Sequence, residues 1–145
     1  MADSQDIEIL NYVNAISHQA TAGMQRRLRE AGLGLVAMEA RTLRYIVRHP
    51  GCTQTDIVRE SGRDKAQIAR VVKVLLERGD IHRITNAAGE RRQPLNATRK
   101  GQGVHRKTEV LRDHVVAELL GDISAQDRAT LSKLLGRVLQ QQNLP

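Results

Sequence analysis

Apolar residues recur with helical spacing along most of this chain, and the clearest case lies between residues 64 and 78. Five apolar residues there fall at i, i+3, i+4, i+7 and i+8, which is one face of a helix: Ile68, Val71, Val72, Leu75 and Leu76. Arg70, Lys73 and Glu77 fall on the opposite side, and Gly79 follows as a helix stop. The pattern predicts a helix with one buried face and one charged face.

The spacing changes from helical to alternating directly after this helix. Residues 81–85 alternate apolar and polar side chains like a strand, and the charged residues 86–92 around Gly89 predict a loop. Residues 95–97 can return as a second strand, with Pro94 at its start because proline has no N–H to donate. A charged helix followed by such a hairpin is half of a winged helix-turn-helix.

The remaining chain also follows helical patterns. Five further helices are predicted, at about 5–31, 36–48, 53–60, 98–120 and from Ser124 onward. Thr53 with Asp56, and Asp64 with Gln67, have the spacing of helix N-caps. Residues 61–63 then form the tight turn that a helix-turn-helix requires. The predicted fold is mainly α with a small β-wing.

The first and last helices carry more apolar surface than one small domain needs. The first is predicted to be about 40 Å long at about 1.5 Å per residue. The last has an apolar stripe that is expected to face inward: Leu131, Leu134, Leu135, Val138 and Leu139. Long apolar helices of this kind usually pack against a partner chain, so we expect a homodimer.

Positive charge is concentrated in the middle of the chain. The 145 residues carry a net charge of +7, and residues 41–106 hold 15 Lys and Arg against 6 Asp and Glu. The rest holds 8 basic residues against 10 acidic ones. The only aromatic residues, Tyr12 and Tyr45, leave little for base stacking. The charge favours a double-stranded polyanion as partner over an evenly solvated surface.

Residues that carry catalysis or hold metals do not gather into a recognisable motif. The five histidines lack paired i, i+4 spacing, and we find no nucleophile arrangement and no glycine-rich phosphate loop. We expect no enzyme, no metal and no cofactor. For the lone Cys52, burial is favoured over a thiol activated by Arg48 and His49. Without a membrane span or a signal peptide in the sequence, a cytoplasmic protein is expected.

Four segments, in their order and spacing, resemble the MarR family of bacterial transcriptional regulators. They read TQTDIV, KAQIARVV, LERGDIHR and LNATRKG, at residues 53–58, 65–72, 76–83 and 95–101. The resemblance covers nearly the whole chain. It implies one domain over residues 1–145, with a winged helix-turn-helix at 35–97 between dimerisation helices at 5–34 and 98–142.

The resemblance also implies a function and two partners. A homodimeric repressor would bind a palindromic operator in double-stranded DNA and be released by a small molecule, typically an aromatic acid in this family. The ligand would lie between the dimerisation helices and the winged domain. Near that junction we expect His18, Arg41, Tyr45 and His105.

The helix at 64–78 is the predicted recognition helix. Only the exposed N-terminal part of such a helix reaches base edges in the major groove. Gln67 and Arg70 are therefore predicted to contact bases. Lys65 and Lys73 are predicted to contact phosphates, because an ammonium group neutralises charge well and reads geometry poorly. Arg63, in the preceding turn, is also a predicted DNA contact.

Thr53, Thr55 and the wing supply the other predicted DNA contacts. Hydroxyl and backbone N–H groups at a helix start can hold a phosphate, although capping alone explains Thr53 equally well. Arg91 or Arg92 is predicted to enter the minor groove. Counting back from Thr98 without a gap favours Arg91, a one-residue gap favours Arg92, and a contact to phosphate alone is the alternative.

Two other functions fit the same sequence features. The winged helix can be a protein-interaction module whose basic surface meets an acidic partner. It can also be a nucleoid-type DNA binder with little sequence preference. Footprinting on DNA separates these from a regulator.

Overall fold

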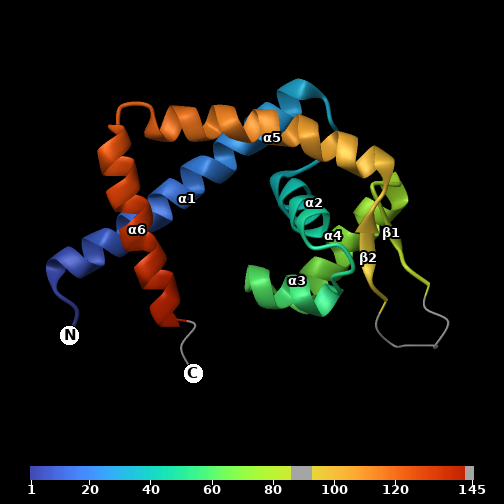
Figure 1. Ribbon diagram of the computed structural model, residues 1–145, viewed down its shortest axis with the longest axis horizontal. Coiled ribbons are helices and arrows are strands. Elements are labelled where there is room, and N and C mark those ends of the chain that lie inside the picture. The colour runs from blue at the N-terminus through green and yellow to red at the C-terminus, as the bar shows by residue number, and fades with distance from the viewer. Residues whose placement is uncertain (86–92, 143–145) are drawn as a thin grey trace.

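The computed structural model describes residues 1–85 and 93–142, which form a mainly helical fold with a small two-stranded sheet (Figure 1). The elements are α1 (Ser4–Ala31), α2 (Ala37–Arg48), α3 (Gln54–Ser61), α4 (Lys65–Arg78), β1 (Ile81–Arg83), β2 (Leu95–Ala97), α5 (Arg99–Leu120) and α6 (Ala125–Gln142). The predicted class, mainly α with a β-wing, is confirmed. Among the described residues, no helix is long and apolar enough to cross a membrane.

Local hydrogen bonds fix where the two helices of the helix-turn-helix begin and end. The Thr53 Oγ1 accepts from the Asp56 N–H at 3.2 Å, and the Asp56 carboxylate accepts from the Thr53 N–H at 2.9 Å. The Asp64 carboxylate caps α4 by accepting from the Gln67 N–H at 2.7 Å. Gly62 ends α3 in a left-handed conformation (φ 66°), which a side chain would disfavour. The sharp turn between α3 and α4 therefore has a local cause.

The hydrophobic core lies where α2, α3, α4 and the two strands meet. Residues with almost no exposed surface come from each of these elements and from α1: Leu28, Leu43, Ile46, Ile57, Ile68, Val72, Leu75, Ile81 and Leu95. The apolar stripe predicted for α4 is part of this core, with Leu76 only partly buried. Among the described residues, the only aromatic side chain at this core is half-buried Tyr45 at its edge.

The strands form an antiparallel pair in which Ile81 faces Ala97 and Arg83 faces Leu95. The segment before α3 joins the same ladder, because the Leu95 N–H donates to the Cys52 carbonyl at 2.8 Å and the Gly51 N–H donates to the Leu95 carbonyl at 2.9 Å. The wing is thereby tied to the start of the helix-turn-helix.

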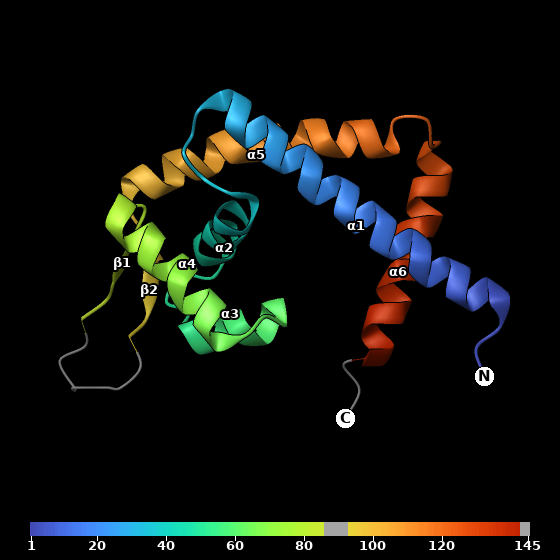
Figure 2. The ribbon, with the colours of Figure 1, turned by 180° about the vertical axis from the view of Figure 1, so that it is seen from behind.

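Two long helices, α1 and α5, pack together above this winged domain (Figures 1 and 2). An ion pair between Arg27 and Glu118 joins them, and Gly23 lies against the side chain of Val115. Figures 1 and 2 show α5 running from the wing to α6 at the opposite end of the molecule.

The expectation that the apolar stripe of α6 faces inward is wrong for a single chain. No residue of α6 is buried, and Leu139 exposes 65% of its surface. The N-terminal half of α1 is equally open, with Leu10 and Val13 both exposed. The cause is geometric: α5 carries α6 away from the winged domain, so no element of the same chain covers the stripe.

A compact junction attaches the start of α5 to the end of α4. The side chain of Asp80 is fully buried and accepts from the Arg78 Nε at 2.6 Å. Its backbone carbonyl accepts from the Thr98 N–H at 3.0 Å, while Arg78 also donates to the Gly34 carbonyl at 3.1 Å. Gly101 packs so closely that a Cβ there would lie 1.8 Å from the Asp80 carbonyl oxygen. We name these five residues the α4–α5 junction.

Candidate DNA-binding surface and effector pocket

The charged face of α4 is exposed and open along the helix. Arg63 in the turn and Lys65, Arg70 and Lys73 on the helix are all exposed, and Gln67 is half-buried. None of the four basic side chains has a hydrogen bond or ion pair within the part of the chain that the structure describes. Because no described residue pairs with them, these cations are available to anionic groups from outside.

The start of α3 lies beside the wing and adds a second polar surface. Thr55 is exposed, whereas the half-buried Thr53 hydroxyl is engaged as the helix cap. Arg83 of β1 donates to the Gln54 side chain at 3.3 Å, which places an exposed guanidinium at the first turn of α3. The sequence analysis missed Arg83, because spacing along one strand carries no information about the helix that lies across from it.

Arg91 and Arg92 lie outside the described residues. The predicted minor-groove contact therefore stays a prediction.

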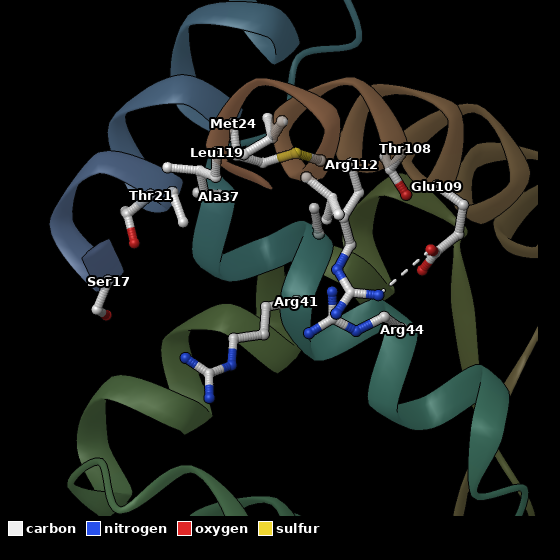
Figure 3. Close-up of a pocket in the computed structure, with 14 residues that line it drawn as sticks. Ser17, Thr21, Met24, Ala37, Arg41, Arg44, Thr108, Glu109, Arg112 and Leu119 are labelled. Atoms are coloured by element: carbon white, nitrogen blue, oxygen red, sulfur yellow. Dashed lines mark ion pairs between the residues drawn. The ribbon is translucent and has the colours of Figure 1, made fainter. Parts of the chain in front are cut away.

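A pocket of about 280 Å³ opens between α1, α2 and α5 (Figure 3). Aliphatic side chains form much of its wall, among them Met24, Val116 and Leu119. Its polar groups include Arg41 and Arg44 from α2 and, from α5, Arg112 and Glu109. The pocket thus lies where the long helices meet the winged domain.

The pocket lining contains three guanidinium groups but only one carboxylate, that of Glu109. Arg112 lies 3.5 Å from the Glu109 carboxylate, the ion pair drawn in Figure 3. Burial lowers the pKa of Arg44, and the neighbouring Arg112 lowers it further, while Glu109 acts in the opposite direction. Positive charge in the pocket is therefore only partly compensated.

The structure brings only one of the four predicted ligand residues to this pocket. Arg41 lines it, whereas His18, Tyr45 and His105 are not among its lining residues. Tyr45 instead stacks on His49, with ring centroids 4.1 Å apart. His105 lies 3.7 Å from Glu109, and burial lowers its pKa.

Arg44 and Arg112 are pocket residues that the sequence analysis missed. Arg44 lies one turn after Arg41, and this i, i+3 spacing opposite the apolar stripe of α2 indicates that both arginines lie on the same face of the helix. The sequence could therefore have identified Arg44. Nothing local links α2 to Arg112, because the packing of α5 on α1 and α2 brings it there.

Cys52 is buried beneath the wing, as expected. Burial raises the pKa of its thiol to about 11, and Asp56 adds to the rise. The alternative of a thiol activated by its sequence neighbours is wrong for this geometry. The ring of His49 stacks on Tyr45, and its Nδ1 lies 3.0 Å from the Tyr45 carbonyl oxygen.

Comparison with known proteins agrees with the order of elements and with the charged α4. Residues 32–92 match the model of the MarR family. The winged helix-turn-helix is therefore similar to that of the MarR family. Among proteins of curated function, none matches the chain.

Solved structures extend this likeness beyond the matched segment. The transcriptional regulator SlyA is 24% identical, with a TM-score of 0.82 and 92% of each chain covered. A putative MarR family regulator from Listeria monocytogenes, solved with a 26mer DNA, is 21% identical, with a TM-score of 0.83 over 97% of this chain and 89% of that one. A MarR family protein from Mycobacterium tuberculosis, solved with salicylic acid, is 18% identical, with a TM-score of 0.72 over 88% and 93%. The chain as a whole has the MarR fold.

Proposed function

We propose that this chain is a sequence-specific regulator of transcription that binds double-stranded DNA as a homodimer. The observation that carries the proposal is a row of four basic side chains on and before α4 that have no partner among the described residues, within a winged helix-turn-helix of the MarR type. The Listeria monocytogenes structure with DNA supports it as an analogy. Repression is the direct outcome when such a protein covers an operator.

In this proposal α4 enters the major groove with its capped N-terminus first. Gln67 and Arg70 read base edges, since an amide pairs in two places with adenine and a guanidinium pairs with guanine. Lys65 and Lys73 neutralise phosphates on either side. Thr55 and the N-terminus of α3 hold a further phosphate.

A homodimer is proposed because α6 and the first half of α1 leave their apolar residues uncovered in one chain. One winged domain reads few base pairs, whereas two related by symmetry read a palindrome. Residues 5–34 and 98–142 would form the pairing region around the winged domain at 35–97.

Sedimentation at micromolar concentration should show a species of about 32 kDa, twice the 16.2 kDa of one chain. Leu135→Glu should shift it toward the monomer, because it places a charge in the apolar stripe. Lys133→Glu, on the opposite face of α6, should leave the dimer intact. A folded 16.2 kDa species for the parent chain would contradict the dimer.

We further propose that a small molecule in the pocket between α1, α2 and α5 releases the DNA. Salicylic acid bound to the Mycobacterium tuberculosis protein supports effector binding by analogy, at 18% identity. A ligand there would act as a wedge between α2 of the winged domain and α5 of the pairing region. It would thereby change the spacing of the two recognition helices.

A footprint on the DNA upstream of the chain's own gene tests the regulator. The expected result is one protected palindrome with two half-sites about 34 Å apart, the length of a helical turn of DNA. Diffuse protection would favour a nucleoid-type binder instead. Absence of DNA binding, together with capture of an acidic protein, would favour an interaction module.

A further inference from the structure

The pocket between α1, α2 and α5 has an excess of positive charge, which favours an anionic ligand. Within the described part of the chain, Arg41 and Arg44 make no hydrogen bond and no ion pair within 4.0 Å. The carboxylate of Glu109, the only acidic group in the pocket lining, is taken up by Arg112 at 3.5 Å. Two guanidinium groups thus remain without a direct partner.

The positive charge occupies two separate positions. Figure 3 shows Arg44 beside Arg112 on the Glu109 side of the pocket, with Arg41 pointing away from them toward the lower part of the view. Burial and the adjacent Arg112 both lower the pKa of Arg44. An anion at each position would remove this repulsion, and each guanidinium can bind a carboxylate through two parallel N–H groups.

The rest of the lining indicates the body of the ligand. Apart from the hydroxyl residues Ser17, Thr21 and Thr108 it is aliphatic, and includes Ala37, Val115 and Leu119. It holds no aromatic side chain, so no ring is available to stack on an aromatic ligand. The volume of about 280 Å³ lies at the lower end of ligand pockets, which suits a short molecule.

We propose that this pocket takes a small aliphatic dicarboxylate, with one carboxylate at Arg44 and Arg112 and the other at Arg41. The inference names the ligand class of the effector site, and it rests on the proposed function only for the consequence of binding. Salicylic acid, the ligand of the Mycobacterium tuberculosis protein, carries one carboxylate and an aromatic ring. The chemistry of this pocket differs on both counts.

Calorimetry on the full-length protein without DNA tests the proposal. Glutarate and adipate should bind at least about tenfold more tightly than pentanoate, hexanoate or benzoate, because a second charged contact is gained. Arg44→Gln and Arg41→Gln should each weaken glutarate and adipate about tenfold and bring them close to the monocarboxylates. Arg48→Gln removes the same charge from an exposed position of α2 outside the pocket and should leave binding unchanged.

Three results would overturn the proposal. These are benzoate or the monocarboxylates binding as tightly as the dicarboxylates, no probe binding at all, and Arg48→Gln weakening binding as much as Arg44→Gln.

Operator affinity is measured separately by anisotropy of labelled DNA. If dicarboxylates bind but the protein stays on the operator, the ligand class is upheld and the release of DNA by the ligand is contradicted. If benzoate alone releases the DNA, release by a ligand is upheld and the dicarboxylate class is contradicted.

Discussion

Gly101→Ala is expected to lower the free energy of unfolding by about 3 kcal/mol, the upper range of overpacking costs. In a helix this exchange ordinarily stabilises by up to about 1 kcal/mol. Here the added Cβ would lie 1.8 Å from the Asp80 carbonyl oxygen, a main-chain atom that cannot turn aside. That carbonyl also accepts from the Thr98 N–H, so relief requires the start of α5 to move off the α4–α5 junction. Urea denaturation at fixed protein concentration measures the change.

Gly103→Ala is the matched control for this experiment. It lies two residues further along α5, and the nearest atom to an added Cβ is the flexible end of Arg106 at 3.7 Å. The exchange should therefore stabilise by about 0.5–1 kcal/mol, as in any exposed helix. A Gly101→Ala variant as stable as the Gly103→Ala variant would refute the tight contact.

Arg70→Ala is expected to weaken operator binding by about 1–3 kcal/mol and to relax the preference at one base pair. Its side chain is exposed and has no partner among the described residues, so helix content and assembly should not change. Gln67→Ala should act similarly at a neighbouring base pair. Its main-chain N–H, which Asp64 caps, is retained in the variant. Competition between operators that differ by single base pairs measures both effects.

Lys73→Ala separates reading of bases from neutralisation of phosphates. Loss of one phosphate contact should lower the slope of log K against log salt by about 0.9 and weaken all sequences alike. Arg70→Ala should, in addition, weaken binding by an amount that depends on the base sequence of the operator. If both Arg70→Ala and Gln67→Ala bound the operator as tightly as the parent, the reading face would be misassigned.

Helix α4 could be predicted from the sequence because its signals are local. The stripe of Ile68, Val72 and Leu75 and the caps at Asp64 and Gly79 lie within one short segment. Core packing then confirms the pattern without altering it. The same reasoning predicted the order of helices and strands along the chain.

The pocket could not be predicted in this way because it is assembled over long separations. Arg44 and Arg112 meet only after α5 packs against α2, and sequence spacing contains no record of that crossing. His18 and Tyr45 were chosen by position along the chain, yet they lie outside the pocket lining. The surroundings of Cys52 also differ from those its sequence neighbours suggested, since burial and Asp56 govern its thiol.

The exposed apolar residues of α1 and α6 show a related limit. The helical spacing of these residues correctly predicted two helices. The spacing contains no information on which chain supplies the surface that packs against them. Leu135 is as apolar as Leu75, yet one is exposed and the other fully buried.

The rigid attachment of α5 at the α4–α5 junction gives the long helix the properties of a lever. With 22 residues, α5 is about 33 Å long at about 1.5 Å per residue. A tilt of about 10° at its first turn would displace its far end by about 6 Å over that length. In a dimer held at that far end, the winged domain would swing instead. A shift of this size is a sizeable fraction of the roughly 34 Å between half-sites. A small ligand bound beside Arg112 would thus change the spacing of the two α4 helices, so that they no longer match the two half-sites, without deforming either helix.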